Sequence, residues 1–250
     1  LGGNIGESFA YSVATEKNFW YVLELSSFQL DGMTKFRADV GVLMNITPDH
    51  LDRYDYKFEN YAASKMRITQ NQSSADAFIY SADDDMTRQM LDKMDSSLRA
   101  RQLPFAINTA IASGDGDAVL EGYTFTASVG KQSVTIDTRK MQIHGMHNIY
   151  NAMAAALATL AAGVEPRVIK RSIYDFSPVE HRLEPAGERN GIRWINDSKA
   201  TNVDSVWYAL ESMQQPTVWI AGGTDKGNDY TPLKEFARRK VKALICMGLD

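Results

Sequence analysis

A short, nearly continuous apolar run from Val40 to Ile46 is the feature that most limits what this chain can fold into. Such a run is typical of a strand buried on both faces, which occurs in parallel sheets covered by helices. Apolar and small residues then recur at helical spacing from Phe58 to Gln70. We therefore expect an α/β fold with a mostly parallel sheet flanked by helices.

The polar loop after this strand is a candidate site. It contains Asp49, His50, Asp52 and Arg53, and the predicted helix that follows carries Lys65. Ligands of open α/β sheets bind outside the carboxyl ends of the strands, where this loop would lie. A solvated turn with a local ion pair explains the loop residues equally well.

Two further candidates lie near the start of the chain. Residues 2–6 are rich in glycine and precede a predicted helix over 7–15, so they form either a ligand-binding loop or a tight turn. Glu24 closes a predicted strand over 18–25. A carboxylate there requires a cation or a buried ion pair, and we favour a hard cation such as Mg²⁺.

Asn148 and Asn151 precede an alanine-rich helix predicted from Ala152 to Ala162 and closed by Gly163. One helical turn separates the two carboxamides, which can donate and accept together, as adenine recognition requires. Capping of the helix by Asn148 is an equally good explanation.

The β/α pattern restarts near Ile192, which predicts a first domain over 1–184 and a second over 185–250. The loop 196–202 carries Asp197, Lys199 and Thr201 before a predicted helix. It suits an anionic ligand, or else an Asx cap with a solvated lysine. A strand over 217–221 then leads into a second glycine-rich loop that contains Lys226.

Composition excludes several classes of protein. The 250 residues are 44% hydrophobic and 23% charged with a net charge of -4, which is typical of a soluble globular protein and gives no reason to expect a nucleic-acid or membrane partner. No apolar segment approaches the roughly 20 residues that span a bilayer. One cysteine, Cys246, excludes an internal disulfide and fits a reducing cytosol. The glycine loop at the first residues and the apolar run 241–250 lead us to expect an internal piece of a longer protein.

An ordered set of short motifs connects these candidates. They are GGNIG, ELSSFQL, NITPDHLDRY, YAASKMRI, GMHNIYNA, HRLE, WINDSKATN and GGTDKG. Each is modest alone, but in this order the set resembles the Mur ligases of bacterial cell-wall precursor synthesis over nearly the whole chain. The resemblance implies a central ATPase domain, incomplete here, followed by part of a Rossmann-like C-terminal domain.

The resemblance also implies a reaction and its participants. ATP phosphorylates a substrate carboxylate, and an amine attacks the resulting acyl phosphate to form an amide. The implied substrates are UDP-N-acetylmuramoyl-L-alanine and D-glutamate, and the implied cofactors are ATP and two Mg²⁺ ions. We expect a cytoplasmic monomer that takes part in peptidoglycan synthesis.

Residue roles follow from the same resemblance. Glu24 and His50 match the residues that bind the two Mg²⁺ ions, and Lys65 matches a lysine carbamylated by CO₂ beside the second ion, so these three are the implied catalytic and metal residues. The substrate-binding matches are Asn4, Ser26, Thr201 and Lys226, the last two at the D-glutamate end. The matches to ATP contacts are Asn148, Asn151, Arg182, Asp197 and Lys199.

One departure from the family pattern qualifies these expectations. No G-x-x-x-x-G-K-[ST] phosphate loop occurs in the 250 residues, and the uridine-binding domain has no counterpart. We therefore expect these residues alone to have little or no ligase activity. A non-catalytic nucleotide-binding or scaffold module is the alternative, whereas a dinucleotide-dependent dehydrogenase is disfavoured because no G-x-G-x-x-G joins a strand to a helix.

Overall fold

The computed structural model describes residues 1–6, 8–94, 97–108, 111, 114–177, 180–223 and 229–248. The chain divides into two compact units. The first consists of Leu1–Ile136 and Met153–Ile169, and the second of Asp137–Ala152 and Lys170–Asp250. The boundary predicted at residue 184 stays a prediction.

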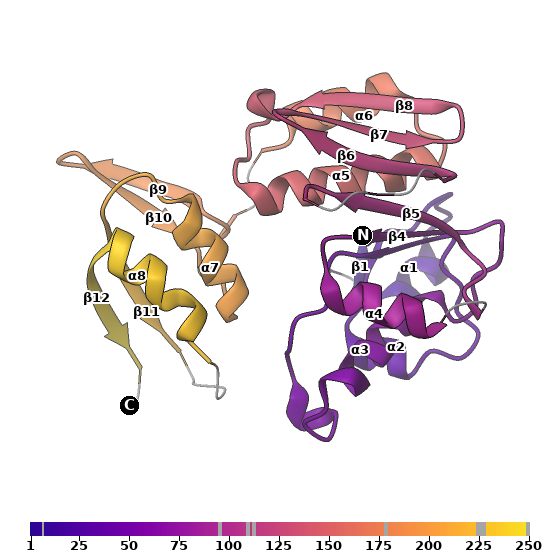
Figure 1. Ribbon diagram of the computed structural model, residues 1–250, viewed down its shortest axis with the longest axis horizontal. Coiled ribbons are helices and arrows are strands. Elements are labelled where there is room, and N and C mark those ends of the chain that lie inside the picture. The colour runs from indigo at the N-terminus through magenta and orange to yellow at the C-terminus, as the bar shows by residue number, and fades with distance from the viewer. Residues whose placement is uncertain are drawn as a thin grey trace. The chain divides into compact units, whose positions relative to one another are not determined.

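A six-stranded sheet forms the centre of the first unit (Figure 1). Its first four strands run parallel, and a hairpin then adds an antiparallel neighbour. In spatial order the strands are β3 (Val40–Leu43), β4 (Ala77–Ser81), β5 (Arg101–Ala106), β6 (Gly116–Glu121), β7 (Thr124–Val129) and β8 (Gln132–Asp137). The predicted mostly parallel α/β fold is confirmed.

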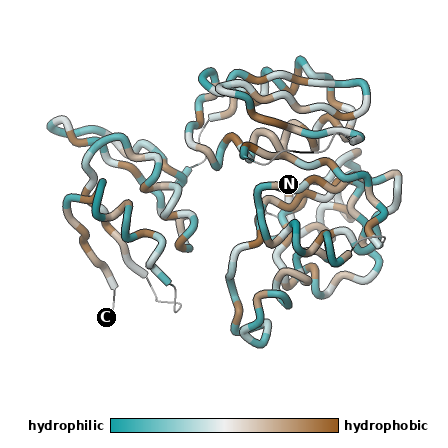
Figure 2. Tube along the Cα trace, viewed as in Figure 1, coloured by the Kyte–Doolittle hydropathy of each residue, from teal (hydrophilic) through white to brown (hydrophobic). Residues whose placement is uncertain are grey.

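The core of this unit lies along the sheet strands. Phe78, Leu103, Phe105 and Phe125 are fully buried, and Figure 2 shows hydrophobic residues concentrated along β4 and β5. Burial of such side chains contributes about 1.5–3 kcal/mol each to the stability of the sheet. The packed strands in turn hold the loops at their ends in place.

A separate pair of short parallel strands, β1 (Gly2–Gly3) and β2 (Leu23–Glu24), completes the strands described in this unit. The glycine-rich segment therefore begins as a strand, and the strand predicted over 18–25 is confined to its end. The associated helices are α1 (Phe9–Thr15), α2 (Ser27–Asp31), α3 (Phe58–Met66) and α4 (Asp85–Met94). This unit also contains the short 3₁₀ turns η1 (Leu51–Arg53) and η2 (Arg67–Thr69), whereas η4 (Thr138–Lys140) belongs to the second unit.

Helix α5 (Met146–Ala161) begins before the predicted start at Ala152, and α6 (Pro166–Asp175) follows it. The first turns of α5 belong to the second unit and the remainder to the first. Gly163 adopts a φ of 82° just beyond α5, which is the left-handed conformation that commonly ends a helix. Within the described part of the chain, no helix is long and apolar enough to cross a membrane.

The second unit contains an antiparallel hairpin and a β-α-β element (Figure 1). The hairpin strands are β9 (Glu184–Arg189) and β10 (Ile192–Asn196). The remaining elements are α7 (Val203–Ser212), β11 (Thr217–Gly222), η5 (Thr231–Leu233), α8 (Lys234–Lys240) and β12 (Val241–Met247). Trp207 of α7 packs edge-on against Phe236 of α8 with ring centroids 4.9 Å apart. Parallel pairing of β11 with β12 across α8 agrees with the predicted Rossmann-like unit.

Candidate functional site

Pairing of β1 with β2 brings Asn4 to Glu24. Gly3 lies opposite Glu24, and the Asn4 amide N–H donates to the Glu24 carbonyl over 2.8 Å. Beyond the strand, Asn4 Nδ2 donates to Glu24 Oε1 over 3.0 Å. Gly3 has a φ of 101°, and a Cβ atom there would overlap the Glu24 carbonyl, so only glycine fits. Glu24 is exposed, so its interpretation as half of a buried ion pair is wrong.

Ser26 follows Glu24 and begins α2. Its Oγ accepts from the Gln29 amide over 3.4 Å, and the Gln29 side chain accepts from the Ser26 amide over 2.9 Å. This reciprocal arrangement is a capping box. It explains the serine structurally, while the role near the muramoyl substrate implied by the resemblance stays a prediction.

The loop after β3 holds His50 in an unusual conformation. His50 has a left-handed φ of 52°, and its amide donates to Asp49 Oδ1 over 2.9 Å. The His50 ring packs on Phe28 of α2 with centroids 5.2 Å apart, and the Arg53 guanidinium lies over the Phe28 ring, 5.6 Å from its centroid. Phe28 therefore links the ELSSFQL motif to this loop.

The ion-pair explanation applies to part of this loop only. Arg53 Nε lies 3.9 Å from Asp52 Oδ2, and both side chains are mostly exposed, so this pair is the solvated turn considered from the sequence. Asp49 also has a local partner, with Oδ2 3.7 Å from His50 Nε2, but its charge in addition raises the pKa values of Lys65 and Tyr61 of α3. Asp49 thus belongs to the candidate site and Asp52 does not.

Lys65 is the centre of this group. Its side chain is half-buried, and Nζ lies over the Tyr61 ring, 5.4 Å from the centroid. Burial lowers the pKa of Lys65, and the nearby charges of Asp49 and Glu24 oppose that change. Burial, with the charge of Asp49, also raises the pKa of Tyr61 to about 12. We call Asn4, Glu24, Asp49, His50 and Lys65 the Lys65 cluster.

By residue type alone, the Lys65 cluster contains donors that a hard cation uses. Glu24 and Asp49 offer the carboxylate oxygens that Mg²⁺ prefers, and His50 adds a nitrogen donor. Lys65 as an ammonium ion would compete with a metal ion and fits only after losing its charge. Across the described residues, no three His, Cys, Asp or Glu side chains are grouped closely enough to hold a metal by themselves.

In the second unit, the loop after β10 meets the turn before β9. Leu183 N–H donates to Asp197 Oδ1 over 3.0 Å, and Lys199 N–H donates to the His181 carbonyl over 3.1 Å. These bonds bring Arg182, Asp197 and Lys199 together, and we call these three the Arg182 cluster. Burial raises the pKa of Asp197, against the opposing effects of the Leu183 amide and the Arg182 charge.

The structure also contains the helix cap that is the alternative explanation of the 196–202 loop. Asn202 Oδ1 caps α7 by accepting from the Ser205 amide over 2.8 Å, and Lys199 and Thr201 are exposed. The Asx cap and an anion-binding loop are therefore compatible, because Asn202 supplies the cap and leaves the other side chains accessible. Lys226 lies outside the described residues.

The first turn of α5 contains Asn148 within the helix and not at its cap. Its amide donates to the Gly145 carbonyl over 3.1 Å, and Nδ2 donates to the His144 carbonyl over 2.8 Å. The capping interpretation is wrong because the helix already begins at Met146. The charges of Asp197 and Arg182 both affect the pKa of His147, so this turn lies near the Arg182 cluster. Asn151 is exposed.

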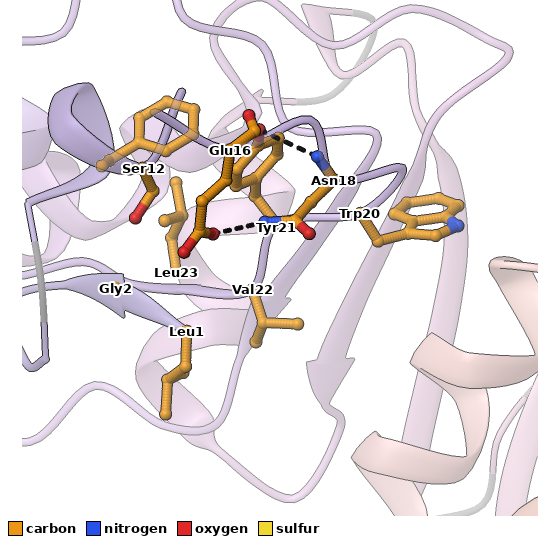
Figure 3. Close-up of a pocket in the computed structure, with 10 residues that line it drawn as sticks. Leu1, Gly2, Ser12, Glu16, Asn18, Trp20, Tyr21, Val22 and Leu23 are labelled. Carbon is orange, nitrogen blue, oxygen red and sulfur yellow. Dashed lines mark hydrogen bonds between the residues drawn. The ribbon is translucent and has the colours of Figure 1, made fainter. Parts of the chain in front are cut away.

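Two hollows are notable in the part of the chain that the structure describes. One, beside β1, has a volume of about 30 Å³ and is bordered by Leu1, Trp20 and Tyr21 among others (Figure 3). This is enough for about one water molecule. A second, of about 280 Å³, lies between the start of α5 and the end of α7 and includes Met146, Ile149 and Glu211. Neither is lined by the predicted site residues.

Sequence reasoning missed some contributors to these clusters. Tyr61 shares a helix face with Lys65, so its helical spacing of four residues was an available signal. Asn196 makes contacts with residues on the other side of a hairpin, and no local pattern reports such contacts.

Comparison with known proteins gives matches along most of the chain. A family model for the Mur ligase middle domain matches residues 6–159, and one for the Mur ligase glutamate ligase domain matches residues 181–250. The chain is 48% identical over 250 residues to the UDP-N-acetylmuramoylalanine--D-glutamate ligase of Christiangramia forsetii, and 49% identical over 249 residues to that of Bacteroides fragilis. Each alignment takes in 100% of this chain and 55% of the relative. The chain therefore spans about half the length of these curated relatives.

Solved structures resemble the fold at low sequence identity. MurF from Acinetobacter baumannii gives a TM-score of 0.63 at 18% identity, with 84% of this chain and 51% of that chain covered. MurF ligase from Thermotoga maritima in complex with ADP gives 0.53 at 16% identity, with 86% and 53% covered. At such identities the likeness shows the fold alone.

Proposed function

This chain belongs to the Mur ligase family, and from that premise we propose that it carries active-site residues of a ligase that joins D-glutamate to UDP-N-acetylmuramoyl-L-alanine. The observation that carries the proposal is Lys65, a half-buried lysine over the Tyr61 ring whose pKa is influenced by the charges of Asp49 and Glu24. The relatives at 46–49% identity are named for this reaction, which supports the choice of substrates.

The proposed chemistry gives the acidic residues of the Lys65 cluster a role. A carboxylate is a poor electrophile until its oxygen becomes part of a phosphate leaving group, so ATP first converts it to an acyl phosphate. The amine of D-glutamate then displaces phosphate and forms the amide. Bound Mg²⁺ would supply positive charge where two anions approach each other. Glu24, His50 and Lys65 would hold the two ions of the proposal, with Asp49 oriented towards Lys65.

Lys65 would serve this site as a carbamate. Burial lowers its pKa and so raises the fraction of neutral amine, which is the form that attacks CO₂. The new N–C bond yields a carbamate with release of one proton, which replaces a cation with an oxygen-donor anion. A ¹³C spectrum of the chain in ¹³C-labelled bicarbonate should show a carbamate signal that Lys65→Arg abolishes. Persistence of the signal in that variant would assign it to another amine.

The Arg182 cluster would bind the nucleotide. Arg182 and Lys199 are exposed cations suited to phosphate, and the carboxamides of Asn148 and Asn151 suit an adenine edge. Thr201, with Lys226, would contact D-glutamate. The MurF of Thermotoga maritima was solved with ADP, which is consistent with a nucleotide in this fold. We also propose a cytoplasmic monomer, and a two-domain division at residue 184.

The test is amide formation by the full-length protein that contains these residues. We expect a product that requires ATP, Mg²⁺, UDP-N-acetylmuramoyl-L-alanine and D-glutamate together. Glu24→Gln should lower kcat by about 100-fold, because a metal and charge-stabilising contact is lost. Glu59→Gln, at an exposed position of α3, is the matched control. No amide with the complete substrate set would contradict the proposal.

The 250 residues alone give a second arm of this test. They have no phosphate loop in their sequence, so we expect them to form little or no amide. ATP-dependent amide formation by this chain would contradict that expectation. Nucleotide binding by a full-length protein that makes no amide would favour the alternative, a non-catalytic nucleotide-binding module.

A further inference from the structure

The turn that presents Arg182 is strained on both sides. His181 has a φ of 65° and Leu183 a φ of 45°, so two side-chain-bearing residues adopt the left-handed conformation around Arg182. Each such residue costs about 1–3 kcal/mol and persists only where neighbouring contacts hold it. The contacts that hold this turn therefore determine where the Arg182 side chain can lie.

Three hydrogen bonds hold the turn over 181–184, two of them to the loop after β10 and one within the turn. Asp197 Oδ1 accepts from Leu183 N–H over 3.0 Å, and the His181 carbonyl accepts from Lys199 N–H over 3.1 Å. Within the turn, Glu184 Oε2 accepts from His181 N–H over 2.8 Å. Two of these three bonds join the turn to the loop after β10.

The carboxamide of Asn196 is shared between the same two segments. Its Nδ2 lies 2.8 Å from His181 Nδ1 and donates to Glu184 Oε2 over 3.1 Å. Its Oδ1 accepts from Ser198 N–H over 3.2 Å. The amide orientation follows from these partners, because the flipped form would bring Oδ1 against the Glu184 carboxylate. Both ends of the carboxamide are thus occupied by protein groups.

This geometry specifies the form of the His181 ring. Nδ1 accepts from Asn196, so the neutral ring carries its proton on Nε2. Glu184 Oε2 lies 3.5 Å from the same Nδ1 atom, so a proton placed on Nδ1 would turn the ring contact towards Glu184 and away from Asn196. The Nε2–H tautomer is therefore a direct signature of the Asn196 contact.

We propose that Asn196 is a positioning residue that locks the His181–Glu184 turn to the loop after β10 and thereby holds Arg182 beside Asp197 and Lys199 for nucleotide binding. This role rests on the proposed function, because it takes the Arg182 cluster as the nucleotide site. Asn196 acts through the side chains of His181 and Glu184, since its own polar atoms are already bonded to protein groups. Holding the cluster in its bound arrangement reduces the ordering cost of binding.

The test follows the affinity of the full-length protein that contains these residues for ADP with Mg²⁺ by NMR titration, with the Leu183 and Lys199 amides as reporters. Asn196→Leu and Asn196→Asp should each weaken binding by about tenfold or more, because both lose the two donor contacts. Asn196→Asp keeps the size of the side chain and the acceptor for Ser198, so it separates the donor contacts from packing. Asn18→Leu removes an exposed asparagine hydrogen bond elsewhere and should leave ADP affinity unchanged.

Two readouts separate positioning from a general loss of structure. Circular dichroism must show that each variant is folded at the titration temperature, and ¹⁵N spectra of the imidazole should show Nε2–H His181 in the unaltered chain and loss of that single form in Asn196→Leu. Unchanged ADP affinity in both Asn196 variants, or an Nδ1–H ring in the unaltered chain, would overturn the positioning role. No ADP binding by the unaltered full-length protein would instead contradict the nucleotide site itself, and the positioning role would fall with it.

Discussion

The guanidinium group of Arg67 donates from Nε to the main-chain carbonyl of Leu30 over 2.8 Å. The same side chain donates from Nη2 to the Met33 carbonyl over 2.8 Å. Leu30 lies in the last turn of α2 and Met33 lies just beyond the end of that helix, where carbonyls lack the usual intrahelical partners. One side chain therefore fixes α2 against the helix that carries Lys65.

Replacement of Arg67 by Met should lower the free energy of unfolding by about 3 kcal/mol. The estimate takes about 1.5 kcal/mol for each hydrogen bond from a charged donor, and the two carbonyls lose those donors in a partly buried position. Urea titration followed by circular dichroism measures the change. Arg171→Met, at an exposed position of α6, should stay within about 0.5 kcal/mol of the unaltered chain. Equal losses in the two variants would contradict the special role of Arg67.

Gly3→Ala should separate Asn4 from Glu24. The new Cβ atom would overlap the Glu24 carbonyl, so the β1–β2 pairing must open. Hydrogen exchange of the Asn4 amide, which donates to that carbonyl over 2.8 Å, should accelerate strongly. Gly122→Ala is a matched control, because Gly122 has a φ of 60° with open space around it. An alanine in this left-handed conformation costs about 1–2 kcal/mol, which should leave the exchange rate of the Asn4 amide unchanged. Slow Asn4 exchange in Gly3→Ala would show that the strand pair adapts.

Asp84→Ala should weaken both the start of α4 and its connection to β3. Asp84 Oδ2 accepts from the Thr87 amide over 2.8 Å and from the Ile46 amide over 3.3 Å. Loss of a helix cap costs about 1 kcal/mol, and the second acceptor raises the expected loss to about 2 kcal/mol. Asp92→Ala, exposed on the same helix, is the control for a lost carboxylate. A thermal midpoint that falls equally in the two variants would contradict the capping role.

Features that depend on local pattern were predictable from the sequence. The apolar run after Ala38 became β3, and the helical spacing beyond Phe58 became α3. In each case the signal and the structure concern the same few consecutive residues. Hydrophobic periodicity reports such features because burial acts on neighbouring side chains in register.

Features that depend on distant partners were not predictable. Glu24 looked costly at the end of an apolar strand, but β2 is short and leaves its carboxylate exposed to Asn4. The start of α5 was missed because residues before Ala152 have ordinary helix propensities, and the hydrogen bond from Asn148 to the His144 carbonyl stabilises the added turn. Asn196 reaches His181 only because a hairpin folds the chain back, and a separation of 15 residues has no periodic signature.

Lys65→Met tests whether the buried charge of Lys65 lowers the free energy of unfolding. Burial lowers the pKa of Lys65 from 10.5, so the folded chain binds this proton less tightly than the unfolded chain. The charged form therefore destabilises the fold fully at any pH below the lowered pKa, and this cost disappears as the pH rises towards 10.5. Lys65→Met should thus be more stable than the unaltered chain at neutral pH, by about 1 kcal/mol or less because the side chain is only half-buried.

The pH dependence isolates the charge from the packing of the new side chain. Any gain from the Met side chain persists at all pH values, whereas the gain from removing the charge shrinks between neutral pH and pH 10.5. Urea titrations of both chains across that range measure the difference, and Lys57→Met, exposed just before α3, should show no such trend. The contact of Lys65 Nζ with the Tyr61 ring at 5.4 Å acts in the opposite direction. A stability difference that grows in favour of Lys65→Met as the pH rises would mean that this contact, with Asp49 and Glu24, outweighs burial and that Lys65 stabilises the fold as an ion.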